Sequence, residues 1–265
     1  MIRVLYIAEI VGKAGISCCK KAFNLAKERF NADFVIACAD GATNGNGLGR
    51  NHAAYLHKLG IDALTTGECC FYKKDLTANI ERIPYVLRPE NLVSGAPGSG
   101  TKVFRNKIGV AVLLGQSHFN KLHGENPWER FDALAARLKA QTPFVIIEFH
   151  AEATAEKQTL FALAAGKVSA VIGSHTRIQT SDERIIGGTA VISCAGRTGS
   201  INSVGGCDTA SRIKEYLSGI PDWTRPAWDN CELQGVSLEL NEDGSAASIE
   251  RFRIPVQGIV PETNS

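Results

Sequence analysis

Short apolar runs typical of β-strands alternate along this chain with longer segments of helical periodicity, and this alternation constrains the fold most. Strand-like runs fall at residues 4–8, 34–39, 63–66, 85–88, 102–105, 109–114, 144–149, 170–173 and 190–193. Helical patterns fall at residues 18–30, 51–59, 127–140, 153–165 and 208–217. Because parallel strands are usually joined by helical crossovers, the alternation predicts an α/β protein with right-handed connections.

The last part of the chain has a different pattern. Residues 235–240 and 247–254 alternate between apolar and polar side chains, and the sequence Asn-Glu-Asp-Gly at 241–244 joins them. This pattern predicts a β-hairpin that extends a sheet edge. The segments 94–100 and 221–230 are predicted to be surface loops.

Composition limits the class of protein. The chain has 265 residues, 44% of them hydrophobic, which is enough to bury the core of a single domain over residues 1–265. A formal net charge of +2 indicates no specific nucleic-acid patch. No segment approaches the ~20 apolar residues of a membrane span, and the N-terminus is typical of a strand, not of a signal peptide. We therefore expect a cytoplasmic protein with no membrane partner, whose eight cysteines are reduced thiols.

Polar or sulfur-containing side chains follow the ends of several predicted strands. They are Glu9, Asp40, Glu68 with its neighbour Cys69, His150 and His175. In open α/β sheets, ligands bind beyond the carboxyl ends of the strands, so one site could collect all of these groups. Carboxylate and imidazole together are typical ligands of divalent Mn, Fe or Zn.

Several short runs resemble one known family. They are IVG at 10–12, GNGL at 45–48, RPEN at 88–91, FHAEAT at 149–154 with EK at 156–157, and GSHT at 173–176 with QT at 179–180. In order and spacing, the sequence resembles the YmdB-like family of calcineurin-type bacterial metallophosphoesterases over nearly its whole length. The resemblance implies a four-layer α/β sandwich of two facing mixed sheets flanked by helices. It also implies a dinuclear metal centre, phosphodiesterase activity, notably on 2′,3′-cyclic nucleotides, and a homo-oligomer.

The family's ligand pattern is only partly present in the first half of the chain. Glu9 stands where the family has its first aspartate ligand, and Asp40 stands where it has a metal-bridging glutamate. Each exchange keeps a carboxylate but moves it by about one methylene. Gly41 replaces an asparagine ligand, and it begins a glycine-rich stretch whose backbone N–H groups could hold phosphate. Together with Asn91 of the RPEN run, Gly41 is therefore a candidate substrate-binding residue.

Two further exchanges affect the chemistry directly. The family's GNH run is Gly67-Glu68-Cys69 here, so Glu68 takes the place of an amide ligand. Cys69 takes the position of the histidine that protonates the leaving group, and a thiol with a reference pKa of ~8.5 is a poor substitute, because a nearby metal favours the thiolate. Arg177 replaces the second histidine of an HTH motif, and a guanidinium cannot ligate a metal.

Sorted by metal position, these residues predict an asymmetric centre. The second-metal set of Asp40, Glu68, His150 and His175 is complete, which predicts one ion of Mn, Fe or Zn, with Mg and a second ion as alternatives. The first-metal set has lost two ligands, at Gly41 and Arg177. We expect Arg177 to stand in for the missing ion, either as a charge partner of Glu9 or by gripping a phosphate.

Three interpretations of function remain open at this point. One is a weakened metal-dependent phosphodiesterase that acts on a nucleotide or another small phosphodiester. A second is a noncatalytic relative that binds a nucleotide or a protein partner in a regulatory role. A softer metal site with thiolate ligands is a third, drawn from the cysteines near strand ends: Cys38, Cys69, Cys70 and Cys194.

Overall fold

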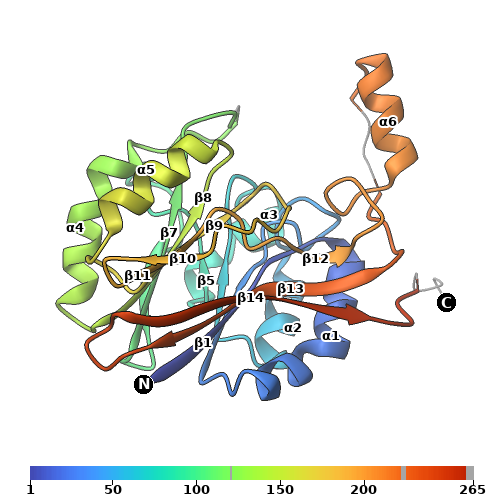
Figure 1. Cartoon of the computed structure of the whole chain (residues 1–265). Coiled ribbons are helices and arrows are strands. Elements are labelled where there is room, and N and C mark those ends of the chain that lie inside the picture. The colour runs from blue at the N-terminus through green and yellow to red at the C-terminus, as the bar shows by residue number, and fades with distance from the viewer. Residues whose placement is uncertain (120, 222–224, 261–265) are drawn as a thin grey trace.

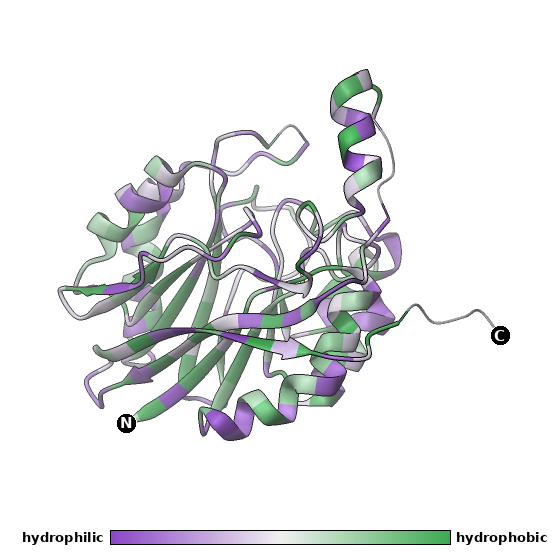
Figure 2. Cartoon of the chain, turned by 45° about the vertical axis from the view of Figure 1, so that its right-hand side comes forward, coloured by the Kyte–Doolittle hydropathy of each residue, from purple (hydrophilic) through white to green (hydrophobic). Residues whose placement is uncertain are grey.

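Two β-sheets face each other, with helices on both outer sides (Figure 1). The computed structural model describes residues 1–119, 121–221 and 225–260. Figure 2 shows hydrophobic residues concentrated along the strands, where the two sheets meet and where the helices cover them. The predicted sandwich of two mixed sheets flanked by helices is therefore confirmed.

The first sheet has eight strands and is mixed, with parallel and antiparallel pairs. Its order is β2-β12-β13-β1-β3-β4-β5, with β14 paired to β13. The strands are β1 (Ile2–Ile7), β2 (Glu9–Ile10), β3 (Phe34–Cys38), β4 (Ala63–Thr65), β5 (Val86–Leu87), β12 (Arg197–Ser200), β13 (Cys231–Leu240) and β14 (Ala246–Val256). Strands β1, β3, β4 and β5 run parallel. The predicted hairpin is β13 and β14, and it extends the sheet by pairing β13 antiparallel with β1.

The second sheet has six strands in the order β10-β11-β9-β8-β7-β6. They are β6 (Thr101–Phe104), β7 (Ile108–Leu114), β8 (Phe144–His150), β9 (Ala170–Ser174), β10 (Arg184–Ile186) and β11 (Thr189–Ile192). The four inner strands are parallel and the two edge strands are antiparallel to their neighbours. The carboxyl ends of β8 and β9 therefore lie side by side.

Helices cover the outer face of each sheet. The helical elements are α1 (Gly12–Arg29), α2 (Arg50–Leu59), α3 (Lys74–Thr77), the 3-10 helix η1 (Ile80–Arg82), α4 (Pro127–Lys139), α5 (Thr154–Ala164) and α6 (Thr209–Ser218). Helices α1 and α2 pack on the first sheet, and α4 and α5 pack on the second. Helix α6 stands away from the sheets and buries none of its residues (Figure 1).

The side chains of each strand point alternately to the two faces of its sheet, and this alternation forms the layers of the fold. In β1, Val4 and Tyr6 point toward the second sheet, whereas Leu5 and Ile7 point toward α1. Because successive side chains of a strand face opposite sides, a strand covered on both faces is apolar throughout. A single hydrophobic cluster, which includes Ile146 of β8, joins the two sheets.

Helix α1 begins six residues before the predicted start. Gly12 has a positive φ of 60°, and a β-carbon at Gly15 would lie 2.5 Å from the carbonyl oxygen of Thr198 in β12. The first turn therefore needs glycine at positions 12 and 15. Because glycine has a poor helix propensity, the sequence pattern did not reveal this turn.

Five short elements were not predicted: the strands β2, β10 and β12, the helix α3 and the 3-10 helix η1. Part of the predicted loop at 221–230, residues 222–224, lies outside the described residues. In the described part of the chain, no helix combines the length and apolar character that a membrane span requires.

Candidate metal centre

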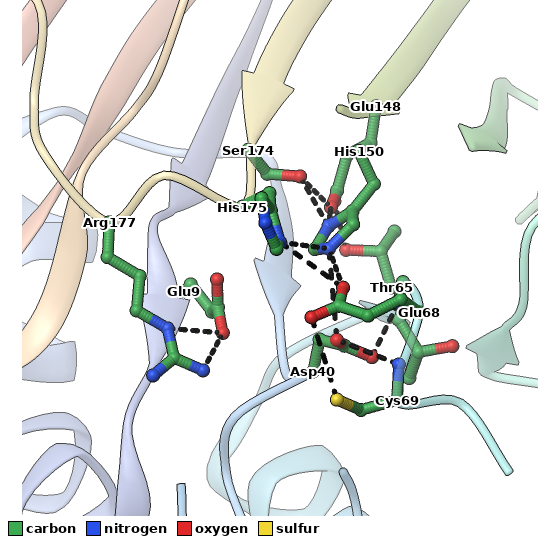
Figure 3. A network of polar contacts seen from close by, with 12 residues as sticks. Glu9, Asp40, Thr65, Glu68, Cys69, Glu148, His150, Ser174, His175 and Arg177 are labelled. Atoms are coloured by element: carbon green, nitrogen blue, oxygen red, sulfur yellow. Dashed lines mark hydrogen bonds and ion pairs between the residues drawn. The ribbon is translucent and has the colours of Figure 1, made fainter. Parts of the chain in front are cut away.

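Four predicted ligands meet where strands of both sheets end. Asp40 follows β3, Glu68 follows β4, His150 is the last residue of β8, and His175 follows β9. Figure 3 shows the two imidazole rings and the Glu68 carboxylate pointing toward one another, with Asp40 beside them. The first sheet thus supplies carboxylates and the second sheet supplies imidazoles.

The donor atoms of three side chains converge, and two of their three spacings match those of a metal site. His175 Nδ1 lies 3.2 Å from His150 Nε2 and 3.3 Å from Glu68 Oε2, and Glu68 Oε2 also contacts His150 Nε2. Adjacent ligands on a tetrahedral ion with bonds of about 2.1 Å are roughly 3.4 Å apart. The residues present therefore fit a divalent transition ion.

Asp40 is held in place by backbone groups. Its Oδ1 accepts a hydrogen bond from the Gly67 N–H at 2.6 Å, and its Oδ2 accepts one from the Cys69 N–H at 3.2 Å. Oδ2 lies 3.8 Å from His150 Nε2. A carboxylate oxygen has a second lone pair, so these hydrogen bonds leave Asp40 able to bind a cation.

The electrostatics of the cluster favour a positive charge at its centre. Burial raises the pKa of Asp40, and the negative charge of Glu68 raises it further. Burial acts to raise the pKa of Glu68 as well, but the charges and hydrogen bonds of His150 and His175 together outweigh burial and lower this pKa. Reciprocally, Glu68 raises the pKa of His150 although burial opposes this. A proton on His150 or a divalent ion would supply the positive charge.

Cys69 lies at the edge of the cluster. Its Sγ is 3.6 Å from Glu68 Oε1. Burial raises the pKa of this thiol, and the negative charges of Asp40 and Glu68 raise it further, so these neighbours favour the protonated form.

The other cysteines differ in their access to possible metal ligands. Cys38 lies within 4.8 Å of donor atoms of Glu148 and His150, whereas Cys70 and Cys194 join no such donor group among the described residues.

Arg177 lies beside the cluster and pairs with Glu9 (Figure 3). Its Nε and Nη2 donate to Glu9 Oε1 at 2.9 and 2.7 Å, Nη2 also donates to the Gly45 carbonyl at 2.9 Å, and Nη1 donates to the Gly205 carbonyl at 3.2 Å. A guanidinium has five N–H groups, so few are left for a phosphate. Glu9 is only 2% exposed and joins none of the donor groups found among the described residues.

Gly41 is adjacent to this ion pair. A β-carbon at position 41 would lie 2.9 Å from Arg177 Nη2 and 2.9 Å from Glu9 Oε1. The guanidinium therefore occupies space that a side chain at position 41 would need. The two exchanges, at Gly41 and Arg177, are sterically matched.

Asn91 is engaged elsewhere. Its Nδ2 donates to the carbonyl oxygens of Leu114 and Glu125 at 2.8 and 2.7 Å, and its Oδ1 accepts from the Leu114 N–H at 2.8 Å. The side chain is fully buried and fastens its loop to the end of β7. A substrate-binding role for Asn91 stays a prediction.

The sequence analysis missed four residues around the histidines. Ser174 contacts His150 Nδ1, Glu148 accepts hydrogen bonds from Ser174 and Thr65, and Glu152 contacts His175 Nε2. Glu148 carried a detectable signal, because it is a charged residue within the apolar strand FVIIEFH. Glu152 and Ser174 lie in the FHAEAT and GSHT runs, which also singled them out, whereas Thr65 carried no signal.

Facing mixed sheets, with carboxylates and histidines gathered at the strand ends, define a metallophosphoesterase. The model of the family described as YmdB-like protein matches residues 5–252, and the chain belongs to this family. It is 33% identical over 257 residues to the 2′,3′-cyclic-nucleotide 2′-phosphodiesterase of Bacillus subtilis, covering 95% of this chain and 97% of that protein.

Two solved structures agree with this assignment. One is the crystal structure of a novel phosphatase from Mycoplasma pneumoniae, with a TM-score of 0.88 and 28% identity over 96% of this chain and 93% of that one. The other is a hypothetical protein from Thermus thermophilus, with a TM-score of 0.85 and 28% identity over 96% of this chain and 99% of that one.

The steric match of Gly41 and Arg177 predicts energetic coupling between them. Gly41→Ala should lower the free energy of unfolding by about 1–3 kcal/mol, as overpacking does, and should cost less in an Arg177→Ala background. Urea unfolding of the four proteins in this cycle measures the coupling. Gly95→Ala, at a position with no atom within 4 Å of the added carbon, is the matched control and should cost the same in both backgrounds. Equal costs for Gly41→Ala in both would contradict the match.

Gly67 predicts a separate effect on the ligands. A β-carbon at this position would overlap the ring of His150, so Gly67→Ala must displace a proposed ligand. We expect affinity for Zn²⁺ or Mn²⁺, measured by calorimetry, to fall roughly 10–100-fold, as when a ligand loses its support. Gly95→Ala should leave the affinity unchanged. An unchanged affinity in Gly67→Ala would remove His150 from the ligand set.

Proposed function

We propose that this protein is a metal-dependent phosphodiesterase for small phosphodiesters, with one divalent ion at Asp40, Glu68, His150 and His175. The observation that carries the proposal is the convergence of three donor atoms: His175 Nδ1 lies 3.2 Å from His150 Nε2 and 3.3 Å from Glu68 Oε2, and these last two atoms are in contact. The mixed imidazole and carboxylate set favours Mn, Fe or Zn. The named activity of the B. subtilis relative makes 2′,3′-cyclic nucleotides the first substrates to test.

Arg177 and Glu9 support a centre with one ion. The guanidinium already places a positive charge beside the cluster, and Glu9, at the family's first-ligand position, has both Arg177 contacts on its Oε1. Gly41 offers no side-chain ligand. Three carboxylates, Glu9, Asp40 and Glu68, carry three negative charges, which one divalent ion and Arg177 would balance.

The residues around the ion divide the remaining tasks. A bound ion would polarise a phosphoryl oxygen and acidify a water molecule. Asp40, fixed by two backbone N–H groups, keeps the site rigid. Cys69 lies at the position from which the leaving group would receive its proton, and a thiol in this acidic surrounding is a weak acid. We therefore expect slow turnover, because loss of an efficient general acid typically costs ~10²–10⁴-fold.

The noncatalytic alternative rests on one specific observation. The guanidinium of Arg177 is committed to Glu9 and two carbonyl groups, which restricts its use on a transition state. A protein that binds a nucleotide without hydrolysing it would show metal binding and ligand binding with no turnover.

Metal content tests the number of ions. Protein saturated with Mn²⁺, Fe²⁺ or Zn²⁺ and then desalted should retain about one ion per chain by mass spectrometry, in line with one complete set of ligands. Glu68→Ala and His175→Ala should lose it, whereas Glu9→Gln should keep it. His123→Ala, at an exposed histidine, is the matched control. Two ions retained per chain would overturn the single-ion assignment.

Turnover tests the enzyme proposal itself. The protein should hydrolyse 2′,3′-cyclic AMP or bis-p-nitrophenyl phosphate slowly and only with metal. Cys69→His, which supplies a better acid, should raise kcat by about 10²-fold or more, while Cys69→Ser should not. If neither the native protein nor Cys69→His hydrolyses either substrate in the metal-loaded state, the noncatalytic alternative is favoured.

A further inference from the structure

We propose that Glu148, acting through Ser174, and Glu152 are positioning residues that fix His150 and His175 in opposite ring tautomers. The lone pairs of His150 Nε2 and His175 Nδ1 then face the same point. This inference rests on the metal site of the proposed function, and it assigns a role to residues outside that site.

The His150 ring belongs to a buried relay. Ser174 Oγ donates to Glu148 Oε1 at 2.7 Å, which uses the only hydrogen of the hydroxyl. The same Oγ lies 2.8 Å from His150 Nδ1, so it must accept a hydrogen there. His150 therefore carries hydrogen on Nδ1. Its Nε2, which faces the Glu68 carboxylate, carries a second hydrogen only in the charged ring and has the lone pair when the ring is neutral.

The His175 ring is fixed from the other side. Its Nε2 lies 2.7 Å from Glu152 Oε2, and a carboxylate can only accept, so the hydrogen is on Nε2. Nδ1 is then the atom with the lone pair, and it faces His150 Nε2 at 3.2 Å. Two lone pairs at this distance repel unless a cation lies between them. The outer carboxylates thus prepare a position for a positive charge.

The local sequence produces this arrangement. Glu148 and His150 are two residues apart on β8, so both side chains leave the same face of the strand. Glu152 follows at the same spacing, just after the strand ends, in the run Glu-Phe-His-Ala-Glu. Carboxylates at both ends of this short run can therefore reach the two rings.

The two outer carboxylates, Glu148 and Glu152, differ in burial, and they should therefore differ in their effect on metal binding. Glu148 is 1% exposed, and a buried charge in an apolar layer is costly unless it is well partnered. The Glu152 side chain is 42% exposed, so water can replace part of its contact. We therefore expect the relay through Ser174 to control metal binding more strongly than Glu152 does.

The test measures two quantities separately: the tautomers of the two histidine rings and the affinity of the protein for metal. Nitrogen chemical shifts of ¹⁵N-labelled histidines, recorded on the metal-free protein while the pH is raised until both rings give the shifts of neutral imidazole, should show Nδ1–H for His150 and Nε2–H for His175. Ser174→Ala should abolish the Nδ1–H preference of His150 and lower Zn²⁺ affinity about 10–100-fold. Glu152→Gln should change affinity less than Ser174→Ala does.

Thr65→Val is the matched control. Thr65 also donates to Glu148, on the other carboxylate oxygen, but has no contact with His150, so this variant should keep the His150 tautomer. An Nε2–H ring at His150 in the native protein, or an unchanged tautomer and affinity in Ser174→Ala, would overturn the proposal. The tautomers as expected, together with no uptake of Zn²⁺, Mn²⁺ or Fe²⁺, would instead overturn the proposed function and leave the ring assignment standing.

Discussion

The face-to-face packing of the two sheets assembles the site, because neither sheet alone carries a complete set of ligands. Asp40 and Glu68 follow strands of the first sheet, while His150 and His175 end or follow strands of the second. One apolar cluster fills the space between the sheets and fixes their separation. Since packed cores resist small displacements, this cluster sets the distances between carboxylates and imidazoles. The chemistry of the site therefore depends on hydrophobic side chains that are not among its proposed ligands.

Charge is distributed across the same boundary. The first sheet contributes the carboxylates of Glu9, Asp40 and Glu68. The second contributes the two rings, the guanidinium of Arg177 and the outer carboxylates of Glu148 and Glu152. Arg177 and Glu9 form an ion pair across this boundary. His150 and Glu68 form a similar contact between a nitrogen group and a carboxylate beside it. A buried pair of charges is weak evidence for stability, because desolvation offsets the attraction. Its significance here is geometric: the guanidinium fills the space beside Gly41 and holds three separate segments, at Glu9, Gly45 and Gly205, around the site.

Local patterns in the sequence predicted most of the strands and helices. They also predicted where the candidate ligands lie at the ends of these strands. The apolar run of β3 and the polar residue after it are visible within a few positions, so Asp40 could be placed at the edge of a sheet from sequence alone. The start of α1 could not be predicted in this way. Its glycine at position 15 is required by close packing against β12, which lies far away in the sequence. The partner of Arg177 is 168 residues distant, and only the resemblance to a family suggested it. Asn91 shows that a local motif also has limits. A short motif cannot distinguish a residue that lines a site from one that holds a loop in place.

Substituting an arginine for a metal ligand preserves some functions of a second ion and removes others. A guanidinium supplies positive charge and hydrogen bonds, but it has no vacant orbital to receive a water molecule and cannot acidify one. It is also attached covalently to the chain. Unlike an ion, it therefore cannot dissociate and release the carboxylates around it. The contacts with Glu9, Gly45 and Gly205 restrict it further. The binding of an anionic ligand should therefore be better preserved in this protein than the activation of a nucleophile, which would fall to one ion held by Asp40, Glu68, His150 and His175.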